Sequence, residues 1–238
     1  LFDIDRFRQT LRLSKEATDL WKAVLATAKH SPAPLSFFDG TIHMGPIVVL
    51  RGTQTAKDYY RELLDELENN IAAKTGVISN EKSRLYWDGM PIWGKLRTLS
   101  DLFIQNNSLV VAYTYCNSWV FDAFDENHPF DSSAKAYTEI FINRSENAKM
   151  KMLKQMADDF RVDGIIFHDA KTCFNNSNTR FGLPLRFYRE HGIPVLLIEG
   201  DLCDLRSYSE GQTTTKIETF IEQLVSQKVM HSAYAGKN

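Results

Sequence analysis

The sequence predicts an α/β protein in which a doubly wound parallel sheet of about four strands follows a helical segment. Two observations support this fold class. From residue 84 onward, short apolar runs alternate with longer stretches of helical periodicity, as repeated βα units require. Before residue 80, apolar residues recur at helical spacing. The patterns change near residues 79–83, so we expect a helical segment at 1–80, an α/β domain at 81–230 and a tail at 231–238.

The helical segment is expected to contain helices separated by clear breakers. The first helix should end before the proline-containing stretch at 31–34, and an apolar segment follows at 35–50. A further helix begins after Gly52 and ends at Gly76. The side chains able to cap these helices are Asp3 or Asp5 in the first and Thr53 or Thr55 in the last. Together these helices are predicted to form a packing element.

The α/β domain is expected to contain four βα units. Its strands are predicted at residues 84–87, 109–115, 164–168 and 194–199, and its helices begin near residues 93, 133, 178 and 214. The last two strands are nearly continuous apolar runs, which predicts that both of their faces are covered. The last helix is the clearest, because its apolar residues Ile217, Phe220, Ile221 and Leu224 follow the i, i+3, i+4, i+7 pattern.

The residues that follow the strands are the candidate site, because ligands of such sheets bind beyond the carboxyl ends of the strands. These segments are polar, and they place Cys116, Cys173 and Cys203 at one rim of the sheet. Three thiolates from separate loops could bind an iron–sulfur centre, since iron prefers thiolate ligands. The alternative is that these cysteines are small hydrophobic residues at strand ends, because no CxxC spacing is present.

Cys173 has the most informative setting of the three. The polar residues after it can open a helix, whose free amides favour a thiolate or an anion, although helix capping alone also explains them. His168, at the end of the third predicted strand, is either a hydrogen-bonded structural histidine or a proton donor, and we assign it as the candidate catalytic group. The residues expected around substrate and cofactor are Asp88, Asn117, Lys171, Ser177 and Asp201.

Composition argues against a nucleic-acid-binding, membrane-spanning or disulfide-rich secreted protein. Lys and Arg total 28 against 30 Asp and Glu, with no long basic run, which argues against a nucleic-acid or anionic-membrane partner. No apolar stretch approaches the roughly 20 residues that span a bilayer. The three cysteines are too few and too widely spaced for a disulfide framework, and no secretory signal is visible behind Leu1. We therefore expect a soluble protein, or a fragment of one, in a reducing cytoplasm.

Several separated motifs resemble one known family. They are the segments at 84–93, 163–168, 171–173, 192–195 and 199–201, together with 206–210 and with 51–53 ahead of Tyr59 and Tyr60. In order and spacing they are similar to the 2-hydroxyacyl-CoA dehydratase and benzoyl-CoA reductase family, and the resemblance covers nearly the whole chain.

The resemblance implies a fold and a cofactor. Family subunits contain two flavodoxin-like α/β domains joined by helices, pair with a homologous second subunit, and hold a 4Fe-4S cluster through three cysteines with one iron left open. Cys173 matches one ligand, although relatives often carry arginine and serine where this chain has Lys171 and Thr172. The other two ligands lie in an N-terminal domain that we expect to be missing from this sequence. Cys116 and Cys203 match positions without a known ligand role.

The resemblance also implies an activity. Family dehydratases eliminate water from an (R)-2-hydroxyacyl-CoA through a ketyl radical, after a separate ATP-hydrolysing iron–sulfur activator has delivered one electron. The alternative within the family is a subunit of ATP-dependent benzoyl-CoA reductase, which reduces an aromatic ring. A third alternative, from another class, is a non-catalytic α/β module that binds a small anionic ligand at the same rim. The sequence leaves open the acyl group, the choice between dehydratase and reductase, and which member of the subunit pair this chain is.

Overall fold

The structure is a computed structural model that describes residues 2–173 and 182–235. Ser177 and the predicted helix start near residue 178 lie outside these described residues. Within them, four strands form one parallel sheet in the order β2-β1-β3-β4. The strands are β1 (Ser83–Asp88), β2 (Ser108–Tyr113), β3 (Gly164–Ala170) and β4 (Val195–Gly200). The predicted parallel α/β fold of flavodoxin-like type is confirmed.

Helices cover the sheet on both faces. Leu85 and Trp87 of β1 pack on the side of α5 (Leu96–Gln105) and α10 (Glu210–Ala235). Between them in the sequence, Tyr86 packs on the opposite side with α8 (Glu146–Asp159) and α9 (Leu183–His191). This alternation is the period of two that a β-strand imposes on its side chains. The sheet is therefore doubly wound, as predicted.

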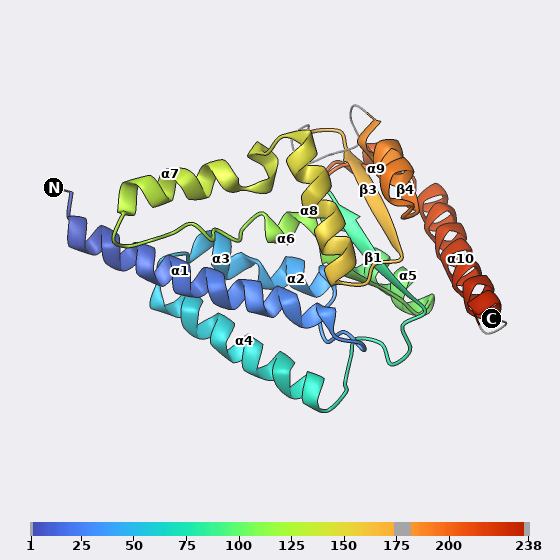
Figure 1. The fold of residues 1–238 in the computed structure, drawn as a ribbon, viewed down its shortest axis with the longest axis horizontal. Helices are drawn as coiled ribbons and strands as arrows, with labels where there is room; N and C mark the ends of the chain where they lie inside the picture. Colours follow the sequence, from blue (N-terminus) through green and yellow to red (C-terminus); the bar gives the residue numbers. More distant parts are fainter. Residues whose placement is uncertain (1, 174–181, 236–238) are drawn as a thin grey trace.

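The N-terminal helices extend from one end of the sheet, so that α1 and α10 lie toward opposite ends of the elongated molecule (Figure 1). They are α1 (Ile4–Ala26), the 3-10 turn η1 (Thr27–Lys29), α2 (Phe37–His43), α3 (Gly45–Val49) and α4 (Gln54–Ala72). Of the alternative caps, Asp3 accepts hydrogen bonds from the amides of Asp5 and Arg6, and Thr53 accepts one from Ala56. The last of these helices ends four residues before Gly76.

These helices share one hydrophobic core with the sheet. The rings of Trp21 and Tyr60 lie 5.1 Å apart between α1 and α4, and the ring of Phe37 stacks on that of Trp87 at 5.3 Å. The same continuous cluster of buried residues reaches Ile217 of α10. Burial of this apolar surface fixes α2 and α3 beside the ends of β1 and β2.

Several boundaries differ from the sequence prediction. β2 ends at Tyr113, because residues 114–117 form the short helix α6 (Thr114–Asn117). β3 continues two residues beyond His168. The helix predicted from residue 133 is two helices, α7 (Pro129–Glu139) and α8, because the backbone at Ile140 is extended and Ser145 caps the second helix. The 3-10 turns η2 (Trp93–Lys95), η3 (Phe141–Asn143) and η5 (Leu205–Ser207) lie in the connections.

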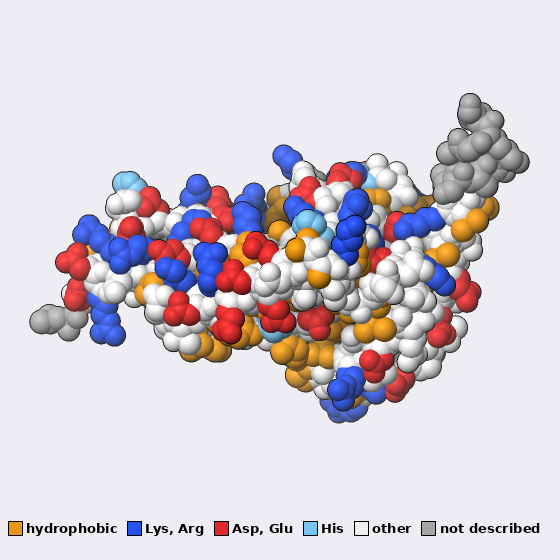
Figure 2. All heavy atoms as spheres, turned by 90° about the horizontal axis from the view of Figure 1, so that it is seen from below, with side chains coloured by type: hydrophobic (Ala, Val, Ile, Leu, Met, Phe, Trp, Pro, Cys, Tyr) orange, Lys and Arg blue, Asp and Glu red, His pale blue; other side chains and the backbone are white. Residues whose placement is uncertain are grey.

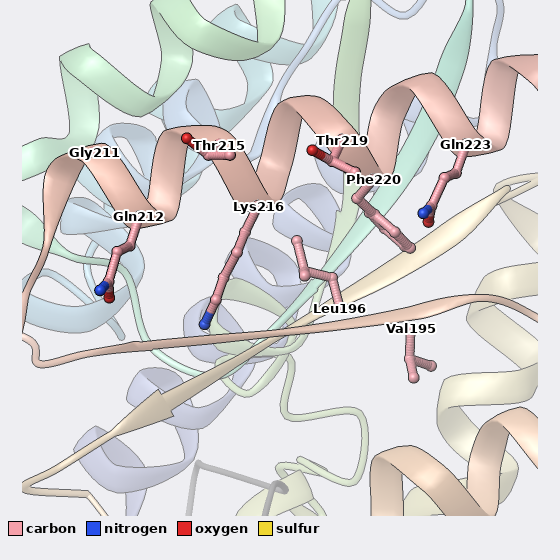
Figure 3. A pocket seen from close by; sticks show the side chains of 9 residues that line it. All are labelled: Val195, Leu196, Gly211, Gln212, Thr215, Lys216, Thr219, Phe220 and Gln223. Atoms are coloured by element: carbon pink, nitrogen blue, oxygen red, sulfur yellow. The ribbon is translucent and has the colours of Figure 1, made fainter.

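The prediction that the fourth strand is covered on both faces is confirmed only in part: Leu196 packs on the α10 side and Val195 on the α9 side, but Leu197 is left exposed. β4 is an edge of the sheet among the described residues, and the side chain of Leu197 is 42% exposed. A cavity of about 850 Å³ lies between this strand and α10. In Figure 3, Leu196 points toward α10 and Val195 points away, while Lys216, Phe220 and Gln223 descend from the helix toward the strand. This large cavity therefore lies at an open sheet edge, away from the Cys173 loop.

The surface is mixed in charge. In Figure 2, acidic and basic side chains are interspersed along the body, and hydrophobic side chains gather along the lower edge of that face. No helix in the described part of the chain has both the length and the apolar character to cross a bilayer.

Candidate functional site

The carboxyl ends of β1 and β3 form the switch point of the sheet. The connection after β1 runs over the face that carries α5, whereas the connection after β3 runs over the face that carries α9. Where successive connections leave to opposite faces, the loops part and leave a crevice in which ligands of flavodoxin-like sheets bind. The loops that follow Asp88 and Ala170 border this crevice, and the second of them carries Cys173.

His168 ties the loop after β1 to β3. Its ring is fully buried, and its Nδ1 lies 2.7 Å from the carbonyl oxygen of Met90. The indole Nε1 of Trp87 donates to the same oxygen at 3.0 Å. Because a carbonyl only accepts hydrogen bonds, Nδ1 must carry the proton, and the neutral ring then leaves Nε2 without one. Burial lowers the pKa of His168, which favours this neutral form.

The other ring nitrogen of His168, Nε2, lies close to the backbone of Gly200. Among the described residues, Nε2 has no hydrogen-bond partner. A β-carbon built on Gly200 would lie 2.8 Å from it, so only glycine fits at this point of β4. The histidine therefore lies inside the strand with its ring enclosed, rather than at an exposed strand end.

Asp201 joins the two loops that carry Cys173 and Cys203. Its Oδ2 accepts hydrogen bonds from the backbone amide of Thr172 at 2.9 Å and from the Thr172 hydroxyl at 2.8 Å. Its Oδ1 accepts longer bonds from the amides of Cys203 and Asp204. The hydroxyl of Thr172 is the main cause that lowers the pKa of Asp201 below its usual value. The Asp201 carboxylate thus joins the loops that follow β3 and β4 through hydrogen bonds to both.

The three cysteines have different environments. Cys173 is half-buried, and its amide donates to the carbonyl of Ala170 at 3.3 Å. Cys203 is exposed. Cys116 is fully buried, with its Sγ 3.8 Å from Thr41 Oγ1, and burial raises the pKa of its thiol far above the usual value. The thiols accessible at the rim are therefore those of Cys173 and Cys203.

Tyr115 lies in α6, directly after the carboxyl end of β2. Its ring is partly buried, and burial is the main cause that raises the pKa of its hydroxyl. Negative charge on the cysteines at this edge of the sheet raises this pKa further. Sequence reasoning treated Tyr115 only as a strand end. The available signal was its position beside Cys116 at the carboxyl end of the second strand.

Asp88 is a buried carboxylate at the end of β1. It accepts a hydrogen bond of 2.5 Å from the hydroxyl of Thr114, which lies 2.9 Å from the hydroxyl of Tyr86. Burial lowers the pKa of Lys149, and the negative charge of Asp88 opposes that shift. Asp88 therefore places a buried negative charge at the carboxyl end of β1.

Of the remaining predicted site residues, Lys171 lies at the same strand ends, whereas Asn117 lies elsewhere. Lys171 is half-exposed, with its Nζ 3.5 Å from Asp169 and 3.7 Å from Glu199. The side-chain amide of Asn117 donates to the carbonyl of Tyr113 at 2.7 Å, and Asn117 lines a separate cavity of about 390 Å³ beside α7 and α8. The structure thus brings Cys173, Asp201 and His168 to neighbouring strand ends, whereas Asn117 belongs to a different cavity.

An apolar pocket adjoins the Tyr115 side of the rim. It has a volume of about 310 Å³ and is lined by residues of α2 and α3 together with Trp93, Tyr115 and Trp119. Sequence patterns did not reveal this pocket, because its walls come from three separate parts of the chain, at residues 41–49, 93 and 115–119.

The donor set for a metal centre is incomplete within the described residues. They contain no group of three or more His, Cys, Asp or Glu side chains placed to hold a metal ion. The thiol of Cys173 is accessible and lies on a loop held by backbone and by Asp201, so it fits one ligand of an iron–sulfur cluster.

Comparison with known proteins gives consistent results. The family model for the 2-hydroxyglutaryl-CoA dehydratase D-component matches residues 1–224. The chain is 30% identical over 228 residues to the (R)-phenyllactyl-CoA dehydratase alpha subunit of Clostridium sporogenes, a match that covers 95% of this chain and 55% of the relative. It is also 30% identical over 239 residues to a benzoyl-CoA reductase subunit of Thauera aromatica, with the same coverage. The chain therefore spans about half the length of these relatives.

Proposed function

The chain belongs to the 2-hydroxyglutaryl-CoA dehydratase D-component family, and we propose that it forms part of an iron–sulfur 2-hydroxyacyl-CoA dehydratase. The enzyme would eliminate water from an (R)-2-hydroxyacyl-CoA after one-electron activation by an ATP-hydrolysing iron–sulfur activator. A homologous second subunit would complete it, as the subunit names of the relatives suggest. The observation that carries this proposal is the accessible thiol of Cys173 on the β3 loop at the switch point.

We assign residues 81–230 as the cluster-binding domain and residues 1–80 as its helical support. The shared core between α1, α4 and the sheet supports this assignment, because it holds the helical segment against the strand ends. Burial of this kind makes a rigid frame for a site built from loops.

The chemistry requires a group that ordinary side chains cannot supply. The proton β to the thioester carbonyl is too weakly acidic for direct elimination, and a bound 4Fe-4S cluster supplies the low-potential electron that makes the hydroxyl a leaving group. Cys173 would hold one iron of that cluster. Asp201 fixes the adjacent Thr172 through two hydrogen bonds, which limits the freedom of the ligand loop.

His168 is proposed as a positioning residue. Its neutral ring donates a hydrogen bond to the carbonyl oxygen of Met90 and thereby fixes the position of the loop after β1 relative to β3. Lys171 and Asp88, at the ends of β3 and β1, are proposed to contribute charge near the thioester, and Asn117 to support the loop after β2. This arrangement would exclude water from the crevice, which strengthens electrostatic interactions with the substrate.

Benzoyl-CoA reduction is the second candidate function. The benzoyl-CoA reductase and phenyllactyl-CoA dehydratase relatives have the same identity to this chain, so sequence identity does not separate ring reduction from dehydration. Turnover of the activated holoenzyme with benzoyl-CoA and with a 2-hydroxyacyl-CoA would separate them.

The proposal is tested by a pair of cysteine variants of the holoenzyme. Cys173→Ser should lose the cluster or leave it degraded, because a serine hydroxyl binds iron poorly. Cys203→Ser is the matched control, since this exposed cysteine lies on the loop joined to the Cys173 loop through Asp201. Iron content, the visible spectrum and turnover are measured after anaerobic purification. Full iron and turnover in Cys173→Ser would contradict the assignment, and no iron in the wild-type enzyme would favour a non-catalytic binding module.

A further inference from the structure

The apolar pocket beside Tyr115 is open to solvent and has hydrophobic walls. Ile42 and Val48 contribute from α2 and α3, and their side chains are 63% and 36% exposed. Trp93 closes the side nearest the loop after β1, and it is 37% exposed. Apolar side chains left exposed around a concavity commonly mark a binding site.

The described lining of the pocket is uncharged. No Lys, Arg, His, Asp or Glu is among its described lining residues. The hydroxyl of Thr41 is engaged with the buried thiol of Cys116. The backbone amide of Trp93 donates to the carbonyl oxygen of Leu202 at 2.9 Å, so the pocket adjoins the loop that carries Cys203 and that Asp201 joins to the Cys173 loop. An occupant would therefore place its reacting end on the Trp93 side, toward the strand ends, and its apolar end between α2 and α3.

On the basis of the function proposed above, we propose that this pocket receives the carbon chain of the acyl group and selects apolar acyl groups over acidic ones. A branched aliphatic or aromatic chain would gain by burial against Ile42, Val48 and Trp93. A terminal carboxylate, as in a glutaryl group, would lose its hydration without meeting a cation. The volume of about 310 Å³ suits an acyl chain and leaves the CoA moiety outside.

The test measures binding of three probes to the holoenzyme: 4-methylpentanoyl-CoA, glutaryl-CoA and free CoA. Trp93 and Trp119 line the pocket, so their fluorescence reports its occupation, and calorimetry gives the affinities. We expect 4-methylpentanoyl-CoA to bind about tenfold or more tightly than glutaryl-CoA. Equal affinities, or tighter binding of glutaryl-CoA, would overturn the inference.

A charge placed in the pocket should reverse the preference. Val48→Lys should weaken the binding of 4-methylpentanoyl-CoA and strengthen the binding of glutaryl-CoA. We expect the ratio of the two affinities to change by about tenfold or more. Ile104→Lys is the matched control, because Ile104 is also 36% exposed and lies on α5 outside the pocket. Equal effects of the two variants would contradict the inference, as would a loss of subunit assembly in Val48→Lys alone, which would show that protein covers the pocket.

Failure of this inference is distinguishable from failure of the proposed function. Iron content is measured on the same samples. A holoenzyme with its cluster that binds both thioesters alike would overturn only the acyl preference. A protein without iron that binds no thioester more tightly than CoA would overturn both.

Discussion

Cys116 and Cys173 each lie just beyond the carboxyl end of a strand in the same parallel sheet, yet only one presents an accessible thiol. After β2 the chain turns at once into α6, and Cys116 is enclosed by Thr41 of α2, while Trp21 of α1 donates to its carbonyl oxygen. After β3 the chain leaves the sheet as a loop, and Cys173 remains half-buried. The element that follows a strand therefore decides whether a rim cysteine can bind a ligand.

The same contrast extends to what holds each cysteine in place. Cys116 is fixed by packing in the main hydrophobic core, and its thiol favours the protonated form. Cys173 is fixed by polar contacts, through its own amide and through the bonds between Thr172 and Asp201. A ligand loop built on hydrogen bonds keeps its thiol available, but it depends on one carboxylate.

Removal of that carboxylate should produce the largest effect. In Asp201→Ala, the amide and hydroxyl of Thr172 lose a charged acceptor, so we expect the melting midpoint to fall by about 5 °C and the holoenzyme to lose much of its iron. Thermal unfolding and iron analysis check this. Asp204→Ala is the control, because Asp204 is a neighbouring carboxylate whose side chain pairs with exposed Arg206. Equal losses of melting midpoint and of iron in both variants would show that Asp201 has no special role.

A smaller effect is expected at His168, which supports the neighbouring β1 loop. His168→Leu removes the donor to Met90, so we expect a loss of about 1 kcal/mol in unfolding free energy and about tenfold lower turnover per mole of cluster. His168→Asn, whose amide nitrogen lies near the position of Nδ1, should restore most of both. A hundredfold loss of turnover in His168→Asn, roughly the size of a lost acid–base group, with an unchanged midpoint would instead indicate direct proton transfer.

The pH dependence of stability sharpens the same test. The pKa of His168 is lowered in the folded protein, so the unfolded chain takes up a proton first as the pH falls below about 6.5. Its contribution to stability is therefore full above that pH and declines on acidification. Urea unfolding between about pH 5 and 8 should show this component in the wild type and not in His168→Asn. An identical pH profile in both proteins would contradict the buried neutral histidine.

The sequence predicted most of the fold because the strands are short apolar runs between helical patterns. Its errors arise where local signals conflict with tertiary structure. Thr114 and Tyr115 favour strands by type, yet they begin α6 because the chain turns inward against α1 and α2. The apolar run of β4 suggested burial on both faces, whereas its position at the sheet edge leaves Leu197 exposed.

The site was less predictable than the fold. Strand-end reasoning placed Cys173 and Asp201 at the rim, because the carboxyl ends of parallel strands lie at one edge. It could not show that Asp201 binds the Thr172 loop, nor that Cys116 turns inward, since both depend on side-chain directions. The pocket beside Tyr115 depends on how α2 and α3 pack against the sheet, which periodicity does not encode.

The most direct test of Cys173 as a cluster ligand is alkylation of the three cysteines, read by mass spectrometry, in the native holoenzyme with and without its cluster. We predict that Cys173 is protected when the cluster is bound and is alkylated when it is removed. Cys203 should react in both states because it is exposed, and Cys116 in neither because it is buried. Equal labelling of Cys173 in both states would contradict its role as a ligand, and cluster-dependent protection of Cys203 instead would show that Cys203 is the ligand.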